Sequence, residues 1–256
     1  MKAVITGAGG RMGQAVLRAL KSDASFTVHA GTERAGSALI GTELAPGAKI
    51  FATLDEALAG ANVVIDFSTP EASLEHASAC AKHNVPIVIG TTGLTDAQRA
   101  ELTAIAKTLA LVLSPNMSIG VNLMIEFAAQ LAQRLGDGFE IDILEAHHRD
   151  KKDAPSGTAL RLADELVRAT GRSASDVRQS RSGLIGQRPR REIGIQALRG
   201  GDVVGEHTVF FFGDGERIEL THRASSRDQF ARGALRAAKW VAGKPPGLYS
   251  MADVLR

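Results

Sequence analysis

Short apolar runs alternate with amphipathic stretches along the first 118 residues of the chain. The apolar runs predict strands at residues 3–5, 26–30, 63–65, 86–89 and 109–113. Helical spacing places Val16, Leu17 and Leu20 on one face of a helix over residues 12–20. Start signals for further helices occur at Thr53 with Glu56, at Thr69 before Pro70, and at Thr95 with Gln98. Because strands that alternate with helices build βαβ units, we expect a parallel sheet that is covered on both faces.

The pattern changes after Pro115. A long helix over residues 119–135 leads into a strand at 139–146, and a polar loop then precedes a helix at 156–170. Strands follow at 192–198, 203–212 and 216–222, separated by glycine-containing turns. Adjacent strands joined by such turns predict antiparallel hairpins, and hence a second domain of mixed α+β type. A last amphipathic helix is expected at residues 230–241.

Composition narrows the class of protein. The chain is 44% apolar and 23% charged, with 27 glycines among 256 residues, more than the usual fraction. A net charge of +2 and an aromatic content of 4% give no reason to expect a nucleic-acid partner. A single cysteine excludes an intrachain disulfide, no apolar run is long enough for a membrane span, and no leader pattern opens the chain. We therefore expect a cytoplasmic protein without a membrane partner.

The first glycine cluster lies between the first predicted strand and its helix. It comprises Gly7, Ala8, Gly9, Gly10, Arg11, Met12 and Gly13. Glycines at this position let the backbone approach a pyrophosphate, which the N–H groups at the start of the helix then bind. Met12 occupies the last glycine position of G-x-G-x-x-G, so the spacing fits G-x-x-G-x-x-G instead, and a plain tight turn is the alternative.

The acidic residue expected after a dinucleotide loop is also present. Glu33 lies 20 residues past Gly13 at the end of the second predicted strand, where an acid binds the ribose hydroxyls. Arg34 follows directly, and an arginine there can contact a 2′-phosphate. The pair therefore leaves both NADH and NADPH open, and a solvated charge pair is the alternative.

Three more strand ends carry small or polar residues. They are Asp66, Phe67, Ser68 and Thr69; Gly90, Thr91, Thr92 and Gly93; and Ser114, Pro115, Asn116 and Met117. In an open α/β sheet, ligands bind outside the carboxyl ends of the strands. Each segment alone is consistent with an ordinary loop, but their recurrence at one edge favours a ligand-binding site.

Residues 145–158 form the segment richest in reactive side chains. Two histidines, an arginine and a lysine, His147, His148, Arg149 and Lys151, follow the end of a predicted strand. Such a group can bind a small polyanion and move protons. Gly157 and Thr158 open the next helix, whose N–H groups can bind a carboxylate. The alternatives are a solvated polar loop and a metal site, which is disfavoured because adjacent residues point apart on a strand.

Two other clusters combine side chains that can bind a metal or a nucleic acid. His76, Cys80 and His83 share a helical face with spacing that suits zinc, but no fourth ligand is evident and Cys80 fits better as a small packed residue. We therefore expect no metal. Five arginines without an acid, Arg178, Arg181, Arg188, Arg190 and Arg191, suggest RNA, but no aromatic residue accompanies them. A solvated or oligomer-facing loop is the better interpretation.

Together these motifs resemble the 4-hydroxy-tetrahydrodipicolinate reductase (dihydrodipicolinate reductase) family of bacterial and plant lysine and diaminopimelate synthesis. The resemblance covers GAGGRMG from Gly7, the acid–arginine pair at Glu33, DFSTPE from Asp66 and GTTG from Gly90. It continues through EAHHRDKKDAPSGTA, GDVVGEHTVFF and THRASSRDQFARGA, which begin at residues 145, 201 and 221. The motifs occur in family order over nearly the whole chain, and the histidine-rich one is far more selective than the glycine loop.

The resemblance implies an α/β fold with a Rossmann-like parallel-sheet domain at residues 1–118 and 228–256. An inserted α+β domain of mixed sheet at 119–227 would bind substrate and form a homotetramer. It implies NADH- or NADPH-dependent reduction of a cyclic unsaturated imine dicarboxylate to tetrahydrodipicolinate, with release of water. The glycine loop, the pair at Glu33 and the strand ends from Gly90 and Ser114 would bind the dinucleotide.

In the inserted domain, the resemblance makes His147 the acid/base residue and Lys151 the proton donor. His148 and the backbone of Gly157 and Thr158 would hold substrate carboxylates, with Arg149 adding charge or orientation. Asp150 stands where some relatives carry a basic or neutral side chain, which alters the electrostatic potential beside the lysine. The alternatives are another imine or semialdehyde reductase of the same plan and a non-catalytic NAD(P)-binding sensor.

Overall fold

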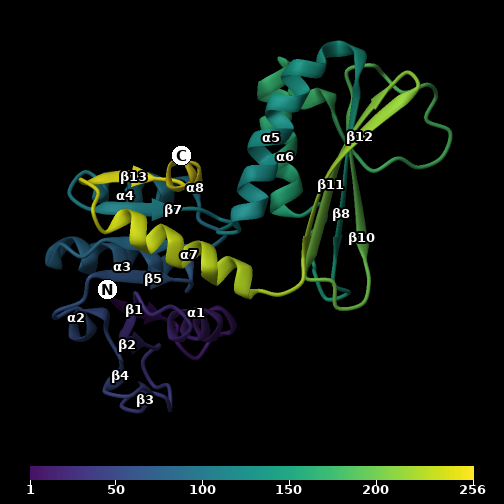
Figure 1. The fold of residues 1–256 in the computed structure, drawn as a ribbon. Helices are drawn as coiled ribbons and strands as arrows, with labels where there is room; N and C mark the ends of the chain where they lie inside the picture. The colour runs from purple at the N-terminus through teal and green to yellow at the C-terminus, as the bar shows by residue number, and fades with distance from the viewer. The chain divides into compact units, whose positions relative to one another are not determined.

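The computed structural model describes all 256 residues. The chain forms two compact units (Figure 1). Unit 1 comprises Met1–Ile119 and Arg227–Arg256, and unit 2 comprises Gly120–Ser226. None of the helices combines the length and apolarity needed to cross a bilayer.

Unit 1 is built on an eight-stranded sheet in the order β13-β7-β6-β5-β1-β2-β4-β3. Its strands are β1 (Lys2–Thr6), β2 (Thr27–Thr32), β3 (Glu43–Ala45), β4 (Ala48–Phe51), β5 (Val63–Asp66), β6 (Ile87–Ile89), β7 (Ala110–Leu113) and β13 (Gly247–Tyr249). Only the β3–β4 pair is antiparallel. The predicted parallel sheet is confirmed, and the pattern missed three strands of three or four residues at the sheet's two ends.

Helices cover both faces of this sheet. They are α1 (Arg11–Lys21), α2 (Leu54–Ala57), α3 (Pro70–His83), α4 (Asp96–Ile105), α7 (Asp228–Val241) and α8 (Met251–Leu255). Side chains of α1, α7 and α8 share one buried cluster with Ile5 and Ile65, and those of α2, α3 and α4 share another with Val4 and Val64. Successive strand residues thus enter opposite cores, which explains why these strands are continuously apolar.

The three side chains of the histidine–cysteine cluster on α3 have separate surroundings. Cys80 is fully buried in the second core, where desolvation raises the pKa of its thiol. His76 contacts Asp66 through Nδ1 at 3.2 Å, and His83 contacts Asp55 through Nε2 at 2.9 Å. The structure contains no group of three or more His, Cys, Asp or Glu side chains arranged to hold a metal ion.

Unit 2 has a five-stranded mixed sheet in the order β12-β11-β8-β10-β9. Its elements are α5 (Ile119–Leu135), η1 (Gly136–Gly138), β8 (Glu140–His147), α6 (Gly157–Thr170), η2 (Ala174–Asp176), β9 (Val177–Gln179), β10 (Ile193–Arg199), β11 (Gly205–Gly213) and β12 (Glu216–Ala224). Helices α5 and α6 lie side by side against one face of the sheet (Figure 1). Their Ile125 and Leu162 pack with Ile143 and Phe211 of the strands.

One predicted pairing in unit 2 is wrong. The strand at 192–198 was expected to form a hairpin with its successor, but β10 instead pairs in parallel with β8. Strand β11 lies on the other side of β8, antiparallel to it, so the chain crosses β8 between the two strands. Only β11 and β12 form the expected hairpin. Glycines at a turn predict a reversal, but not whether a third strand is inserted between the two arms.

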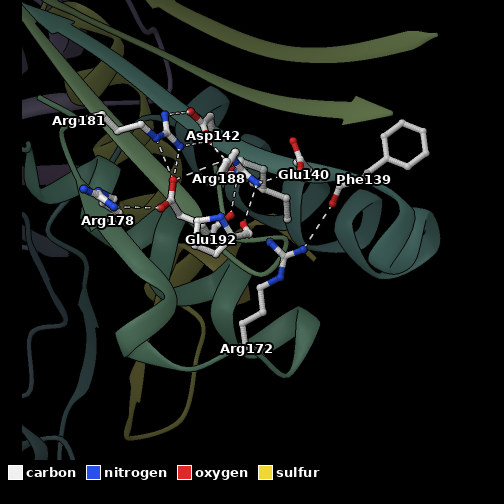
Figure 2. A network of polar contacts seen from close by, with 10 residues as sticks. Phe139, Glu140, Asp142, Arg172, Arg178, Arg181, Arg188 and Glu192 are labelled. Atoms are coloured by element: carbon white, nitrogen blue, oxygen red, sulfur yellow. Dashed lines mark hydrogen bonds and ion pairs between the residues drawn. The ribbon is translucent and has the colours of Figure 1, made fainter. Parts of the chain in front are cut away.

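The arginine-rich segment is not simply solvated, which corrects the interpretation drawn from composition. Arg181 donates to Asp142 Oδ2 from Nη1 at 2.6 Å and to Oδ1 from Nη2 at 2.9 Å, and its Nε donates to Glu192 at 2.9 Å. Arg188 donates to the carbonyl of Ile141 and to Asp142. Figure 2 shows these guanidinium groups converging on the two carboxylates. The acids that pair with the arginines lie outside the run of sequence that suggested a solvated loop.

Gly194 makes room for this network. A Cβ there would collide with Nη2 of Arg181 and lie 2.6 Å from Oδ1 of Asp142. Burial alone raises the pKa of Asp142, but the bonds from Arg181 and Arg188 outweigh it and hold that pKa below its usual range. Asp142 is therefore an ionised, half-buried anchor for residues 181–192.

We expect Arg181→Ala to lower the free energy of unfolding by about 1.5–3 kcal/mol at pH 7, the range for hydrogen bonds to a charged group. Because the folded pKa of Asp142 is depressed, the pair stabilises fully above the unfolded pKa of about 3.9. Its contribution is lost as the pH falls through the folded pKa, so wild type and variant should converge in acid. Urea denaturation followed by circular dichroism at several pH values measures both effects.

Arg168→Ala is the control, because Arg168 pairs with Glu165 on the exposed surface of α6 at 3.1 Å. It should change the free energy of unfolding by less than about 0.5 kcal/mol. Equal losses in the two variants would show that the Asp142 network contributes no more than an ordinary surface ion pair.

Candidate active site

The glycine loop joins β1 to α1 and leaves the start of the helix without a side-chain cap. Gly10 is the N-cap residue, so the first-turn N–H groups lack the usual side-chain partner. A Cβ at Gly13 would overlap the carbonyl oxygen of Gly7, and one at Gly9 would lie 3.0 Å from Glu33 Oε1. The loop is thus a close-packed backbone cradle of the kind that holds a pyrophosphate at a helix N-terminus.

Glu33 lies against this loop, as the spacing predicts. Its Oε1 accepts a hydrogen bond from the backbone N–H of Gly9 at 2.6 Å. Arg34 is exposed beside it. The carboxylate that would bind ribose hydroxyls and the guanidinium that would meet a 2′-phosphate therefore follow the same strand end, next to the cradle.

The remaining polar strand ends share the same sheet edge. Strands β7, β6, β5, β1 and β2 are neighbours in this order and all run parallel, so their carboxyl ends lie together. Gly90 packs so tightly on Phe67 that a Cβ would overlap the ring. Thr92 and Pro115 are exposed at the edge, and Ser114 is buried, with its hydroxyl donating to the carbonyl of Asn116 at 2.8 Å. Met117 differs from the rest because its side chain is buried in the core, which leaves only its backbone for a ligand.

The carboxylate of Asp66, which the sequence named only as part of a polar strand end, is buried and ties these strand ends together. Asp66 accepts hydrogen bonds from the hydroxyls of Thr6, Ser73 and Thr91, and His76 contacts it at 3.2 Å. Desolvation raises the pKa of Asp66, but the contacts with His76 and the hydroxyls outweigh it and leave the pKa below its usual range. Asp66 thereby links β1, β5 and the GTTG loop.

In unit 2, the candidate acid–base segment begins at the end of β8. His147 Nδ1 donates to Glu145 Oε2 at 2.6 Å. Glu145 has no exposed surface, and Arg199 on β10 donates to both of its oxygens, at 2.7 and 2.8 Å. Burial raises the pKa of Glu145, but the Arg199 and His147 bonds outweigh it and keep the carboxylate ionised at neutral pH.

This arrangement fixes the protonation of His147. The ionised Glu145 accepts a hydrogen bond from Nδ1 of His147. The neutral ring therefore carries its proton on Nδ1 and has no proton on Nε2. Desolvation lowers the pKa of His147 more than Glu145 raises it, so the neutral ring prevails at pH 7. A Cβ at Gly205 would lie 3.0 Å from Nε2, so the glycine leaves space at this atom. His147 is thus a proton acceptor at neutral pH.

A second histidine supports the same segment and was missed in the sequence. His207 on β11 is only 4% exposed, and burial lowers its pKa to about 4. Its Nε2 contacts Ser156 Oγ at 3.0 Å, and its ring meets that of His147 edge to face at 5.2 Å. Since the buried Nδ1 has no partner, the neutral ring donates from Nε2. The GEHT sequence around His207 was visible, but nothing in the local pattern gave that histidine a role.

Ser156 in turn caps α6, which starts at Gly157. Its hydroxyl accepts from the N–H of Ala159 at 3.2 Å, and its own N–H donates to Glu145 at 3.0 Å. Gly157 is exposed and Thr158 half-buried, at the positive end of a 14-residue helix. This helix start is suited to bind a carboxylate.

Lys151 follows in the loop and is held by a neighbour that the sequence reasoning did not choose. Its Nζ donates to both oxygens of Asp153 at 2.9 Å, so Asp153 and not Asp150 is its carboxylate partner. The contact with Lys151 lowers the pKa of Asp153. The carbonyl of His148 accepts from the Lys151 N–H, and the exposed Arg149 is fixed through its own N–H to the carbonyl of Gly201.

Comparison with known proteins agrees with these features. Family models described as dihydrodipicolinate reductase, N-terminus and C-terminus, match residues 1–117 and 120–255. The chain belongs to the dihydrodipicolinate reductase family. A 4-hydroxy-tetrahydrodipicolinate reductase of Myxococcus xanthus is 56% identical, covering 100% of this chain and 97% of the relative. One from Anaeromyxobacter dehalogenans is 52% identical, covering 99% and 97%.

A solved structure supports the same family. The dipicolinate-bound dihydrodipicolinate reductase from Paenisporosarcina sp. TG-14 superposes with a TM-score of 0.80 at 26% identity, covering 98% of this chain and 97% of that one. Membership of the dihydrodipicolinate reductase family makes the chain an NAD(P)H-dependent oxidoreductase, which confirms the enzyme class and the dinucleotide predicted from the sequence.

Cofactor choice should depend on Arg34 in this reductase. Arg34→Ala should remove the charge-assisted contact that we expect Arg34 to make with a 2′-phosphate, worth about 1.5–3 kcal/mol. It should weaken NADPH binding by about ten- to a hundredfold and leave NADH binding nearly unchanged. Titration calorimetry with each cofactor measures the two affinities. Arg99→Ala, an exposed arginine on α4, is the control and should change neither; equal weakening of both cofactors by Arg34→Ala would assign Arg34 another role.

Proposed function

We propose that the chain reduces 4-hydroxy-tetrahydrodipicolinate to tetrahydrodipicolinate with NADH or NADPH and releases water, as a step of lysine and diaminopimelate synthesis. The observation that carries the proposal is the buried Glu145, which holds His147 at one side and the start of α6 at the other. Such a fixed histidine beside a helix N-terminus is suited to a dicarboxylate whose reaction includes proton transfer. A non-catalytic dinucleotide-binding sensor would not require this histidine arrangement.

Each unit binds a different reactant. We assign the dinucleotide to residues 1–118 and 228–256 and the substrate to residues 119–227. The cradle at Gly7, Ala8, Gly9, Gly10, Arg11 and Met12, with Glu33, Arg34, Gly90, Thr91, Thr92, Ser114, Pro115, Asn116 and Met117, binds the cofactor. When bound, the dinucleotide supplies a hydride to the conjugated imine.

Residues of unit 2 bind the substrate carboxylates and transfer protons. The backbone at Gly157 and Thr158, with His148 and Arg149, binds the substrate carboxylates. Hydride addition to the conjugated ring leaves an enamine-like carbon that needs a proton, and the ammonium of Lys151 donates it. His147, neutral with a bare Nε2, complements that cation as the proton acceptor of the site.

We further propose a cytoplasmic homotetramer. Helices α5 and α6 cover one face of the unit 2 sheet, and the other carries the stacked rings of Phe210 and Phe212 and a 55% exposed Leu198. Apolar side chains on an uncovered sheet face favour association with further copies of the chain. The single, buried Cys80 and the use of a reduced dinucleotide support the cytoplasm.

The purified chain should oxidise NADH or NADPH only when the condensation product of pyruvate and aspartate semialdehyde is supplied. Loss of dinucleotide absorbance at 340 nm measures the reaction. Unrelated semialdehydes, offered at the same concentration, are the control and should give no loss. Equal oxidation with those compounds and none with the condensation product would favour the other imine or semialdehyde reductases of this plan.

Lys151→Ala should lower kcat by about 10²–10⁴-fold, the usual contribution of a general acid. Dinucleotide affinity should stay nearly normal, because the cofactor cradle belongs to the other unit. Lys152→Ala is a matched control, since Lys152 is the next residue and is exposed. Steady-state kinetics at saturating cofactor compare the two variants. A near-normal kcat for Lys151→Ala would remove the lysine from the mechanism.

A further inference from the structure

Arg199, the last residue of β10, contacts two separate parts of the acid–base segment. Its Nη1 and Nη2 donate to the two oxygens of Glu145 at 2.7 and 2.8 Å. The same Nη2 donates to the carbonyl oxygen of Asp153 at 2.6 Å. The guanidinium plane is rigid and presents its donors in a fixed fork, so its contacts set the positions of both partners together.

Each partner of Arg199 holds one candidate proton-transfer group. Glu145 accepts from His147 Nδ1 at 2.6 Å, and the carboxylate of Asp153 accepts from Lys151 Nζ at 2.9 Å. Two short chains of contacts therefore start at one guanidinium and end at the imidazole and the ammonium. The Arg199 side chain donates no hydrogen bond to His147 or Lys151, although Arg199 and His147 are backbone neighbours in the β10–β8 pairing.

We infer that Arg199 is the positioning residue of this segment: one guanidinium orients His147 through Glu145 and places Lys151 through Asp153. The inference rests on the proposed function, because it takes these two side chains as the groups that move protons. Arg199 itself acts only through them.

The charges around His147 give this inference a measurable signature. Glu145 on its own strand, Lys151 in the loop, Arg199 on β10 and His207 on β11 are the titratable groups that face it. His207 is neutral at pH 7 because its pKa is about 4. Glu145 therefore favours the imidazolium, and the two cations oppose it.

Opposite substitutions should move the protonation of His147 in opposite directions. Without Arg199, the Glu145 carboxylate is uncompensated, so the Glu145–His147 pair takes up its proton at a higher pH. Without the Glu145 charge, Arg199 is uncompensated and the imidazole takes up its proton at a lower pH. A side chain that only stabilised the fold would cause neither shift.

Strand β8 offers a matched control. Arg181 donates to both oxygens of Asp142 at 2.6 and 2.9 Å, just as Arg199 does to Glu145. The two arginine side chains are similarly exposed, 22% and 20%. Arg181 has no contact with either candidate proton-transfer group. Arg181→Gln therefore removes a comparable ion pair from the same strand without touching the chemistry.

The experiment compares Arg199→Gln, Arg199→Lys, Glu145→Gln and Arg181→Gln in the full chain. Imidazole NMR titration of His147, without substrate or cofactor, gives its protonation, and steady-state kinetics give kcat and the dinucleotide KM. The His147 imidazole should titrate at a higher pH in Arg199→Gln than in wild type, and at a lower pH in Glu145→Gln. Both should lower kcat by about tenfold or more, within the range of acid–base catalysis, with KM for the dinucleotide unchanged. Arg199→Lys keeps the charge and should restore the titration more than the rate.

Wild-type titration and kcat in Arg199→Gln would overturn the inference, as would an equal loss of kcat in Arg181→Gln. If Arg199→Gln does not fold, Glu145→Gln and Arg199→Lys test the inference instead. A wild-type titration of His147 in Glu145→Gln would also overturn the inference. The two proposals fail separately. A wild-type chain without reductase activity refutes the proposed function, whereas the titration of His147 tests the role of Arg199 without any turnover.

Discussion

A carboxylate with no access to solvent is costly unless its charge is paired and its lone pairs are bonded, and the acid–base segment of unit 2 depends on that constraint. Glu145 meets it by accepting from Arg199 twice, from His147 and from the N–H of Ser156. These donors come from a neighbouring strand, from the same strand and from the start of a helix. The need to satisfy one buried charge therefore sets the orientation of the histidine and the place where α6 begins.

Unit 1 also contains a buried carboxylate, which has a different set of partners. Asp66 is buried at the end of a central strand, and hydroxyls from β1, α3 and the GTTG loop donate to it, with His76 beside them. Three segments of this sheet edge are thus fixed by one buried carboxylate. Glycines complete the edge, because a Cβ at Gly13 or Gly90 would collide with backbone or ring atoms.

Local pattern was enough to predict much of this fold. The five strands of the parallel sheet, their helices and the caps at Thr53, Thr69 and Thr95 depend on residues close in sequence. The short strands β3, β4 and β13 were missed because three or four residues at a sheet end carry too little periodicity. The β10 pairing was wrong because two glycines indicate a turn without indicating the strand that separates its arms.

In the candidate site, too, local pattern indicates some residues and not others. The sequence proposes His147, Lys151 and the α6 start because they lie within one run of reactive residues, and the glycine loop because of its spacing. Arg199 is 54 residues from Glu145 in the sequence and was not considered, since no local pattern connects them. The arginines near residue 181 were interpreted as solvated for the same reason, as Asp142 lies 39 residues earlier. Long-range charge pairing decides both cases, and sequence spacing does not encode it.

Strand β8 shows how one element can serve both fold and chemistry. Successive side chains of a strand point to opposite faces, so Asp142 and Glu145, three residues apart, lie on opposite sides of the sheet. Asp142, away from the helices, accepts from Arg181 and Arg188 and thereby anchors residues 181–192. Glu145, toward the helices, accepts from Arg199 at both oxygens and from the His147 imidazole at Oε2. The same pairing of carboxylate and guanidinium thus occurs twice on one strand, as a structural anchor at Asp142 and, at Glu145, beside an imidazole that can gain or lose a proton.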